Sequence, residues 1–169
     1  MFKRVALTVL AAGALGVAVG GLTAPRSTVQ ASMAQVIAPQ TQAIWDITNR
    51  VTNDAGDALD PSKISAADWA KLGTAGRQLR EEALLLAKDG DVTVAESGAK
   101  IEGASAKQIE AYINANRAAF AEHARTLADA GDAIVKASET KDVAPLFKAA
   151  SNLDQLCESC HVQFWYPPQ

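Results

Sequence analysis

Five residues near the C-terminus constrain this chain most: Cys157, Glu158, Ser159, Cys160 and His161. The spacing C-x-x-C-H lets two thiols form thioether bonds to the vinyl groups of one haem, while the adjacent imidazole binds its iron. These are the only two cysteines among the 169 residues. We therefore expect one covalently attached haem c, held by Cys157 and Cys160, with His161 as a ligand of the iron.

A C-x-x-C pair also occurs in local disulfides, in dithiol redox centres and in zinc sites. A zinc site needs four ligands, and the only histidine besides His161 is His123. A thioredoxin-like pair would follow a strand and open a helix in an α/β fold, whereas this motif ends a helix in a helical chain. A haem-free helical interaction module with a Cys157–Cys160 disulfide remains the alternative.

The N-terminal segment, residues 1–22, has the layout of an export signal. Lys3 and Arg4 precede an apolar run over residues 5–22 that contains no acidic residue. We expect a periplasmic protein whose folded domain covers residues 23–169. The apolar run is about 18 residues long, marginal for crossing a bilayer, so an uncleaved N-terminal membrane anchor is the other interpretation.

The net charge of the chain indicates which kinds of partner it can bind. Removing Lys3 and Arg4 takes the formal net charge from −3 to −5, and no arginine- or lysine-rich tract suggests nucleic-acid binding. We expect redox partner proteins with a basic docking face, although a merely solvated acidic surface explains the same composition.

Helical periodicity recurs four times after the signal, and no segment reads as a strand. We expect helices over residues 27–53, 65–88, 105–135 and 142–165. Pro39 interrupts the first pattern and should distort the helix just past Met33, because it removes one backbone hydrogen bond. The polar, glycine-containing residues 91–103 read as a connection.

Several local signals mark the ends of these helices. Ser27 begins an S-x-x-Q capping box for the first helix, Ser65 with Asp68 caps the second, and Ser105 with Gln108 caps the third. Gly131 lies inside the third helix as a packing or flexible point.

Amphipathic helices with connections of moderate length predict an all-α, antiparallel up-down-up-down four-helix bundle with the haem at one end. In that topology the first and last helices run antiparallel, so Met33 and His161 share one end of the bundle. Met33 is the only methionine outside the signal. A thioether opposite an imidazole is a known pair of haem iron ligands, and filling a gap in the core is the alternative role for a lone methionine.

The same geometry places His123 about 17 residues into the third helix, roughly 26 Å from the haem end at 1.5 Å per residue. We therefore expect His123 to be a surface histidine or one whose hydrogen bonds are satisfied within the fold, and Glu82 to face water. The haem end should be lined by apolar residues from the second and third helices, namely Leu85, Leu86, Ile109 and Tyr112.

A C-terminal C-x-x-C-H on the last helix of a four-helix bundle, behind an export signal, resembles the class II cytochromes c. This group contains cytochrome c prime and its low-spin, six-coordinate relatives. The segment over residues 32–39, followed by Ile44 and Trp45, is similar to the low-spin branch. One departure is the aromatic run Phe164-Trp165-Tyr166, where family members often have a tyrosine and then a basic residue.

The resemblance implies thioether bonds from Cys157 and Cys160, proximal iron ligation by His161 and distal ligation by Met33. It also implies that the protein carries single electrons and is not an enzyme. If Met33 does not bind the iron, the five-coordinate haem would suit a scavenger or sensor of nitric oxide or carbon monoxide. Pairing into a homodimer through the first two helices is open, although no large apolar face demands it.

Overall fold

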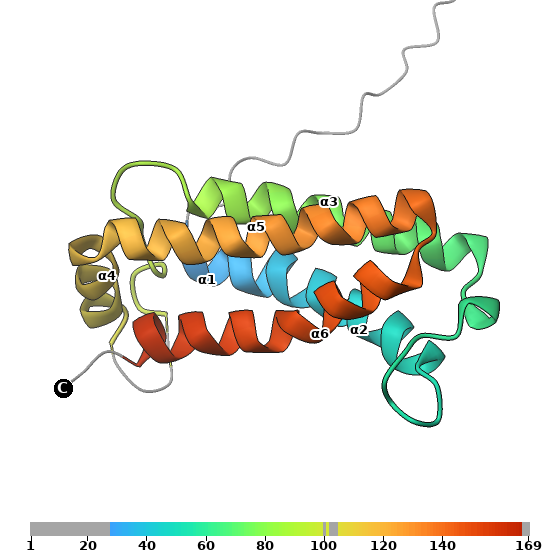
Figure 1. Ribbon diagram of the computed structural model, residues 1–169. Helices are drawn as coiled ribbons and strands as arrows, with labels where there is room; N and C mark the ends of the chain where they lie inside the picture. Colours follow the sequence, from blue (N-terminus) through green and yellow to red (C-terminus); the bar gives the residue numbers. More distant parts are fainter. Residues whose placement is uncertain (1–27, 100, 102–104, 167–169) are drawn as a thin grey trace, which may run out of the picture.

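The computed structural model describes residues 28–99, 101 and 105–166 of the chain (Figure 1). All regular elements within these ranges are helical, which confirms the expected all-α class. The predicted export signal, residues 1–22, lies outside the described residues. Across the part that is described, no helix combines the length and the apolar character needed to cross a membrane.

The first helical stretch is continuous but changes its winding. It consists of α1 (Val29–Ser32), a π turn η1 (Met33–Ile37) and α2 (Ala38–Val51). Thr28 is the N-cap, because its side chain accepts a hydrogen bond of 3.1 Å from the amide of Ala31. The cap is therefore not Ser27 as predicted, and Ser27 itself lies outside the described residues.

The expected distortion before Pro39 takes the form of the π turn η1. Pro39 has no N–H to donate to the carbonyl four residues earlier, and its ring crowds that carbonyl. In η1 the amide of Ala38 instead bonds the carbonyl of Met33, five residues back. Single π turns of this kind inside α-helices are often found at functional sites.

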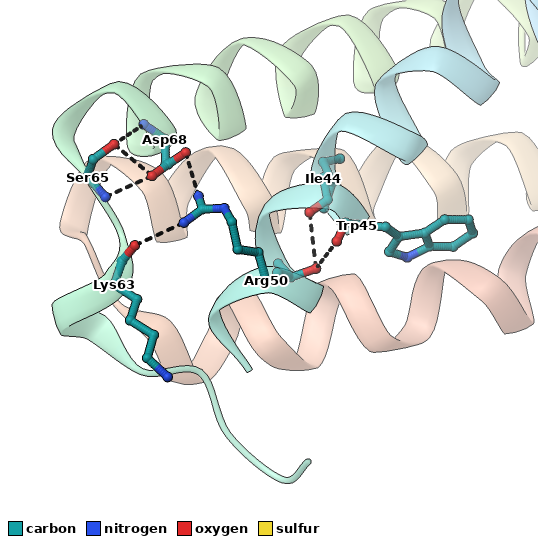
Figure 2. A network of polar contacts seen from close by, with 7 residues as sticks. Ile44, Trp45, Arg50, Lys63, Ser65 and Asp68 are labelled. Carbon is teal, nitrogen blue, oxygen red and sulfur yellow. Dashed lines mark hydrogen bonds and ion pairs between the residues drawn. The ribbon is translucent and has the colours of Figure 1, made fainter. Parts of the chain in front are cut away.

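Helix α3 (Ala66–Leu86) follows a short 3₁₀ turn, η2 (Pro61–Lys63), and opens with the predicted capping box. The Ser65 hydroxyl accepts from the Asp68 amide at 3.1 Å, and the Asp68 carboxylate accepts from the Ser65 amide at 2.9 Å. Arg50 from α2 adds an ion pair of 2.8 Å to Asp68, and Figure 2 shows how this network joins the two helices.

The predicted third helix is two helices, α4 (Ala106–Ala115) and α5 (Arg117–Thr140), separated at Asn116. Asn116 leaves the helical region with φ −118° and ψ 34°, and its side chain donates to the carbonyl of Tyr112 at 2.9 Å. The capping box of Ser105 with Gln108 opens α4 as predicted. Figure 1 shows α4 turned away from the direction of α5, at the end of the molecule where α5 begins.

Long-range contacts hold this break in place. Asn114 on α4 exchanges two hydrogen bonds with the backbone of Val92 in the connection after α3, at 2.9 and 3.1 Å. At the start of α5, the guanidinium of Arg117 donates to the carbonyls of Leu86, Lys88 and Gly90, where α3 ends. The connection is thus partly buried between α1 and α4, as the fully covered Val94 shows.

The last helix, α6 (Val143–Cys160), is capped by Asp142 and continues into a second π turn, η3 (His161–Trp165). The predicted end at Trp165 is confirmed. Pro167 and Pro168, which we expected to stop the helix, lie outside the described residues.

The long helices pack side by side, and successive ones run in opposite directions (Figure 1). Helix α3 packs on α2 and α5, while α6 packs on α5 and, more sparsely, on α2. Helices α3 and α5 approach most closely where Gly76 and Gly131 face each other, which confirms Gly131 as a packing point. The sparser packing between α2 and α6 leaves the space described next.

Candidate functional site

An apolar cavity of about 290 Å³ lies among α2, α5 and α6. This volume is close to the lower end of the range for small-molecule sites, about 300–1,000 Å³. Its walls come from η1 and α2, the end of α3, the first turns of α5, and the end of α6: Met33, Ile37, Ala38, Thr41, Gln42, Trp45, Leu86, Phe120, His123, Ala124, Leu127, Leu156, Cys157, Cys160 and His161.

All four residues predicted to hold a haem line this cavity. Met33 comes from the first helical stretch, and Cys157, Cys160 and His161 come from the last. Residues from the two ends of the described chain therefore line one cavity. Their roles as thioether and iron ligands stay predictions.

The two predicted iron ligands occupy equivalent positions in their helices. Met33 is the first residue of the π turn η1, and its carbonyl accepts the amide of Ala38. His161 is the first residue of η3, and its carbonyl accepts the amide of Tyr166 at 3.3 Å. Each π turn places one more residue in the turn than an α-helix does, so it changes the direction of the side chains that precede it.

Cys157 and Cys160 are half-buried free thiols. Burial and the nearby charge of Asp154 raise the pKa of Cys157. Burial, with a smaller contribution from Cys157, raises the pKa of Cys160 to about 11. Reactive dithiol pairs work through thiolates with lowered pKa values, so these surroundings do not suit such chemistry. Among the described residues, no group of three or more His, Cys, Asp or Glu side chains is arranged to hold a metal ion.

The cavity wall also carries an unused hydrogen-bonding group. Thr41 is 4% exposed, and its hydroxyl has no hydrogen-bond partner within the described residues. By contrast, the indole N–H of Trp45 donates to the carbonyl of Ala150 at 3.1 Å and joins α2 to α6 across the wall. Two thiols, an imidazole and a thioether around one apolar space match the donor set of a covalent haem with two axial ligands. The residues present therefore fit the group.

His123 lies at the cavity rather than far from it as we predicted, although its hydrogen bond to Gln163 agrees with the expectation of a satisfied histidine. It lines the same cavity as His161, and its Nε2 lies 2.8 Å from Oε1 of Gln163 in η3. The error came from treating residues 105–135 as one helix. Because the chain turns at Asn116, α5 begins at the cavity end, and His123 is only in its second turn.

An aromatic cluster supports the C-terminal π turn. Phe164 is 2% exposed and packs edge-on against Phe120 at 5.3 Å and His123 at 5.5 Å, with Tyr112 at 6.2 Å between ring centroids. The cluster fixes the segment that follows His161 to α4 and α5. The aromatic run that departs from the family pattern thus contributes to the core.

The other predicted lining residues are only partly correct. Leu86 lines the cavity, whereas Leu85 is 38% exposed. Ile109 and Tyr112 do not line the cavity and pack in the hydrophobic core. Glu82, predicted to face water, is 5% exposed. The start of the first helical stretch and the connection after α3 lie beside Glu82, where they line a common pocket with it. Neither neighbour follows from helical periodicity.

No protein-family model, no curated protein and no solved structure matches this chain.

Proposed function

We propose that this protein is a c-type cytochrome that carries single electrons through one covalent haem. The observation that carries the proposal is the convergence of Met33, Cys157, Cys160 and His161 on one apolar cavity. Cys157 and Cys160 would hold the haem by thioether bonds, and His161 and Met33 would supply its axial ligands.

When bound, the haem supplies a one-electron ferric–ferrous couple. The chain's own residues bind and shield it: the thioether of Met33 favours the ferrous iron and raises the reduction potential. The apolar walls would limit the contact of the haem with water, and the hydrogen bond from Trp45 to Ala150 connects the two facing helices. Ligands held in this way need little rearrangement when an electron moves.

The finer architecture belongs to the same proposal. The alternating directions of the long helices support an up-down-up-down four-helix bundle with the haem at one end. We further propose that residues 1–22 export the chain to the periplasm, where covalent haem attachment takes place.

The deciding experiment begins with haem staining of the purified protein on a denaturing gel, because only a covalently attached haem stays with the chain. Absorption spectra of wild type and Met33→Ala, oxidised and reduced, then test the axial ligand. We expect a weak far-red sulfur-to-iron band in the oxidised wild type, and carbon monoxide binding to the reduced form only after Met33 is removed.

Two other results would lead to the alternatives. A high-spin wild-type spectrum that changes readily with carbon monoxide would contradict ligation by Met33 and favour a binder of nitric oxide or carbon monoxide. A protein that never stains for haem would refute the cytochrome and favour the disulfide-linked interaction module.

A further inference from the structure

The cavity opens to solvent between α2 and α6. Of its lining residues, the exposed ones are Ala38 and Gln42 on α2 and His161 at the end of α6. We call the surface around this opening the mouth, and define it by Ala38, Gln42, Asp46, Asp154, Glu158 and His161. Of the surfaces around the predicted iron ligands, the mouth would offer an electron the shortest path between a bound redox partner and those ligands.

The charged side chains that define the mouth are all carboxylates: Asp46, Asp154 and Glu158. Within the two flanking helical stretches, residues 28–49 and 149–166 contain the carboxylates of Asp46, Asp154 and Glu158 and no lysine or arginine. Arg50 and Lys148 follow directly outside these ranges, and Arg50 is paired with Asp68. Helices α3 and α5, which also contribute to the cavity wall, carry both acidic and basic residues along their length.

The three carboxylates are exposed, and none forms an ion pair with any described residue. Asp46 accepts only a neutral hydrogen bond, from the amide of Gln42 at 2.7 Å. Asp154 lies three residues before Cys157 on α6, so the two side chains are neighbours on the helix. The negative potential of the three carboxylates is therefore available to an approaching molecule.

Two apolar side chains stand at the same end. Val162 is 57% exposed and Tyr166 is 60% exposed, both on or directly after η3. Transient electron-transfer complexes combine small contact areas with complementary charge, which orients the partners and accelerates their encounter. A carboxylate-bearing surface with exposed apolar residues beside the redox centre has both properties.

We propose that the mouth is the docking face for a redox protein with a lysine- or arginine-rich surface. This inference rests on the proposed electron-transfer function, because it assigns the direction from which the electron enters and leaves. Carboxylates at the mouth attract the cationic partner over about 10 Å at 0.1 M salt and orient it toward His161.

The test measures electron exchange between the reduced holoprotein and three oxidants by stopped-flow absorption. The oxidants are the trivalent cation tris(phenanthroline)cobalt(III), the trivalent anion hexacyanoferrate(III) and, as a protein probe, a basic mitochondrial-type cytochrome c. The mouth variant is Asp154→Asn with Glu158→Gln. The matched control, Glu81→Gln with Glu139→Gln, makes the same change in net charge on exposed residues of α3 and α5.

Removing two charges about 10 Å from a trivalent cation should slow its reaction about fivefold at 0.1 M ionic strength. We expect the mouth variant to react more slowly with the cobalt complex and the basic cytochrome, and faster with hexacyanoferrate. The control should stay within about twofold of wild type in all three reactions, because neither Glu81 nor Glu139 lies on the helical stretches that border the mouth.

Equal responses of the mouth and control variants would overturn the docking face while leaving the cytochrome intact. A protein without covalent haem would refute the proposed function, and the docking face with it. Those two failures are distinguished by the haem stain before any rate is measured.

Discussion

The substitution Gly131→Ala should separate helices α3 and α5. A Cβ at position 131 would lie 2.7 Å from the carbonyl oxygen of Gly76 and 2.9 Å from the backbone nitrogen of Arg80. Both neighbours are backbone atoms of α3, so no side-chain rotation can relieve the overlap. The two helices must move apart along a contact that also positions Leu86 and His123 at the cavity.

The expected magnitude follows from two opposing effects. Overpacking a closely fitted contact costs about 1–3 kcal/mol, while alanine gains about 1 kcal/mol over glycine inside a helix. Because both close contacts are with backbone atoms that cannot rotate away, the overpacking cost should lie in the upper part of its range, at about 2–3 kcal/mol. The net result for Gly131→Ala is then a loss of about 1–2 kcal/mol in the free energy of unfolding. For a domain of this size that loss lowers Tm by about 2–8 °C.

Gly73→Ala is the matched control, because it is the same substitution in the same pair of helices. Its new Cβ would meet the Ser138 hydroxyl at 2.7 Å, and that side chain can rotate away at the loss of its hydrogen bond to the carbonyl of Val135. A lost hydrogen bond of about 1 kcal/mol roughly cancels the helix gain, so Tm should change little.

Thermal and denaturant unfolding, followed by circular dichroism on the holoprotein, measure both variants. The reasoning would be refuted if Gly131→Ala were as stable as wild type, or if Gly73→Ala lost as much stability as Gly131→Ala. The first result would mean that the helices do not approach at Gly131, and the second that the space around both glycines is equally rigid.

Two further predictions concern the polar contacts that join the helices. The Ser65 hydroxyl and amide lower the pKa of Asp68 to about 2, so its stabilisation is present above its ordinary pKa near 3.8 and is lost as the pH falls toward 2. Asp68→Ala should therefore lower the free energy of unfolding by about 1 kcal/mol at pH 7. In denaturant titrations repeated between pH 4 and 2, the difference between wild type and variant should shrink. A difference that does not depend on pH would contradict the role assigned to the Asp68 carboxylate. Trp45→Phe keeps an aromatic ring but removes the hydrogen bond to Ala150. It should lower the free energy of unfolding by about 1 kcal/mol in the same denaturant titration. An unchanged midpoint would show that this bond does not hold α2 to α6.

Much of the local structure could be predicted because it depends on neighbours in the sequence. The capping boxes at Ser65 and Ser105 and the distortion before Pro39 each follow from side chains within a few residues. The end of the last helix at Trp165 was predicted in the same way. Helix length, by contrast, failed at Asn116, where no glycine or proline marks a break.

In the candidate site, too, some residues could be predicted from the sequence and others could not. The C-x-x-C-H spacing singled out Cys157, Cys160 and His161, and the expected antiparallel topology singled out Met33; all four line the same cavity. His123 was missed because its position depends on the turn at Asn116 rather than on its own neighbours. Arg117, directly after Asn116, was one signal for the break between α4 and α5, because a guanidinium can cap the carbonyl end of another helix. The carbonyls that it binds at the end of α3 cannot be identified from the sequence.

The sequence by itself determined that this chain is helical, where most of its helices begin, and which side chains could hold a covalent haem. Those features come from backbone propensity, capping and ligand spacing, which act over one or two helical turns. Only the tertiary structure decided that α4 turns away from α5, that Glu82 is buried, and that His123 joins the cavity. These depend on contacts between residues far apart in the chain, such as Asn114 with Val92, whose free energy is gained only once the helices have packed.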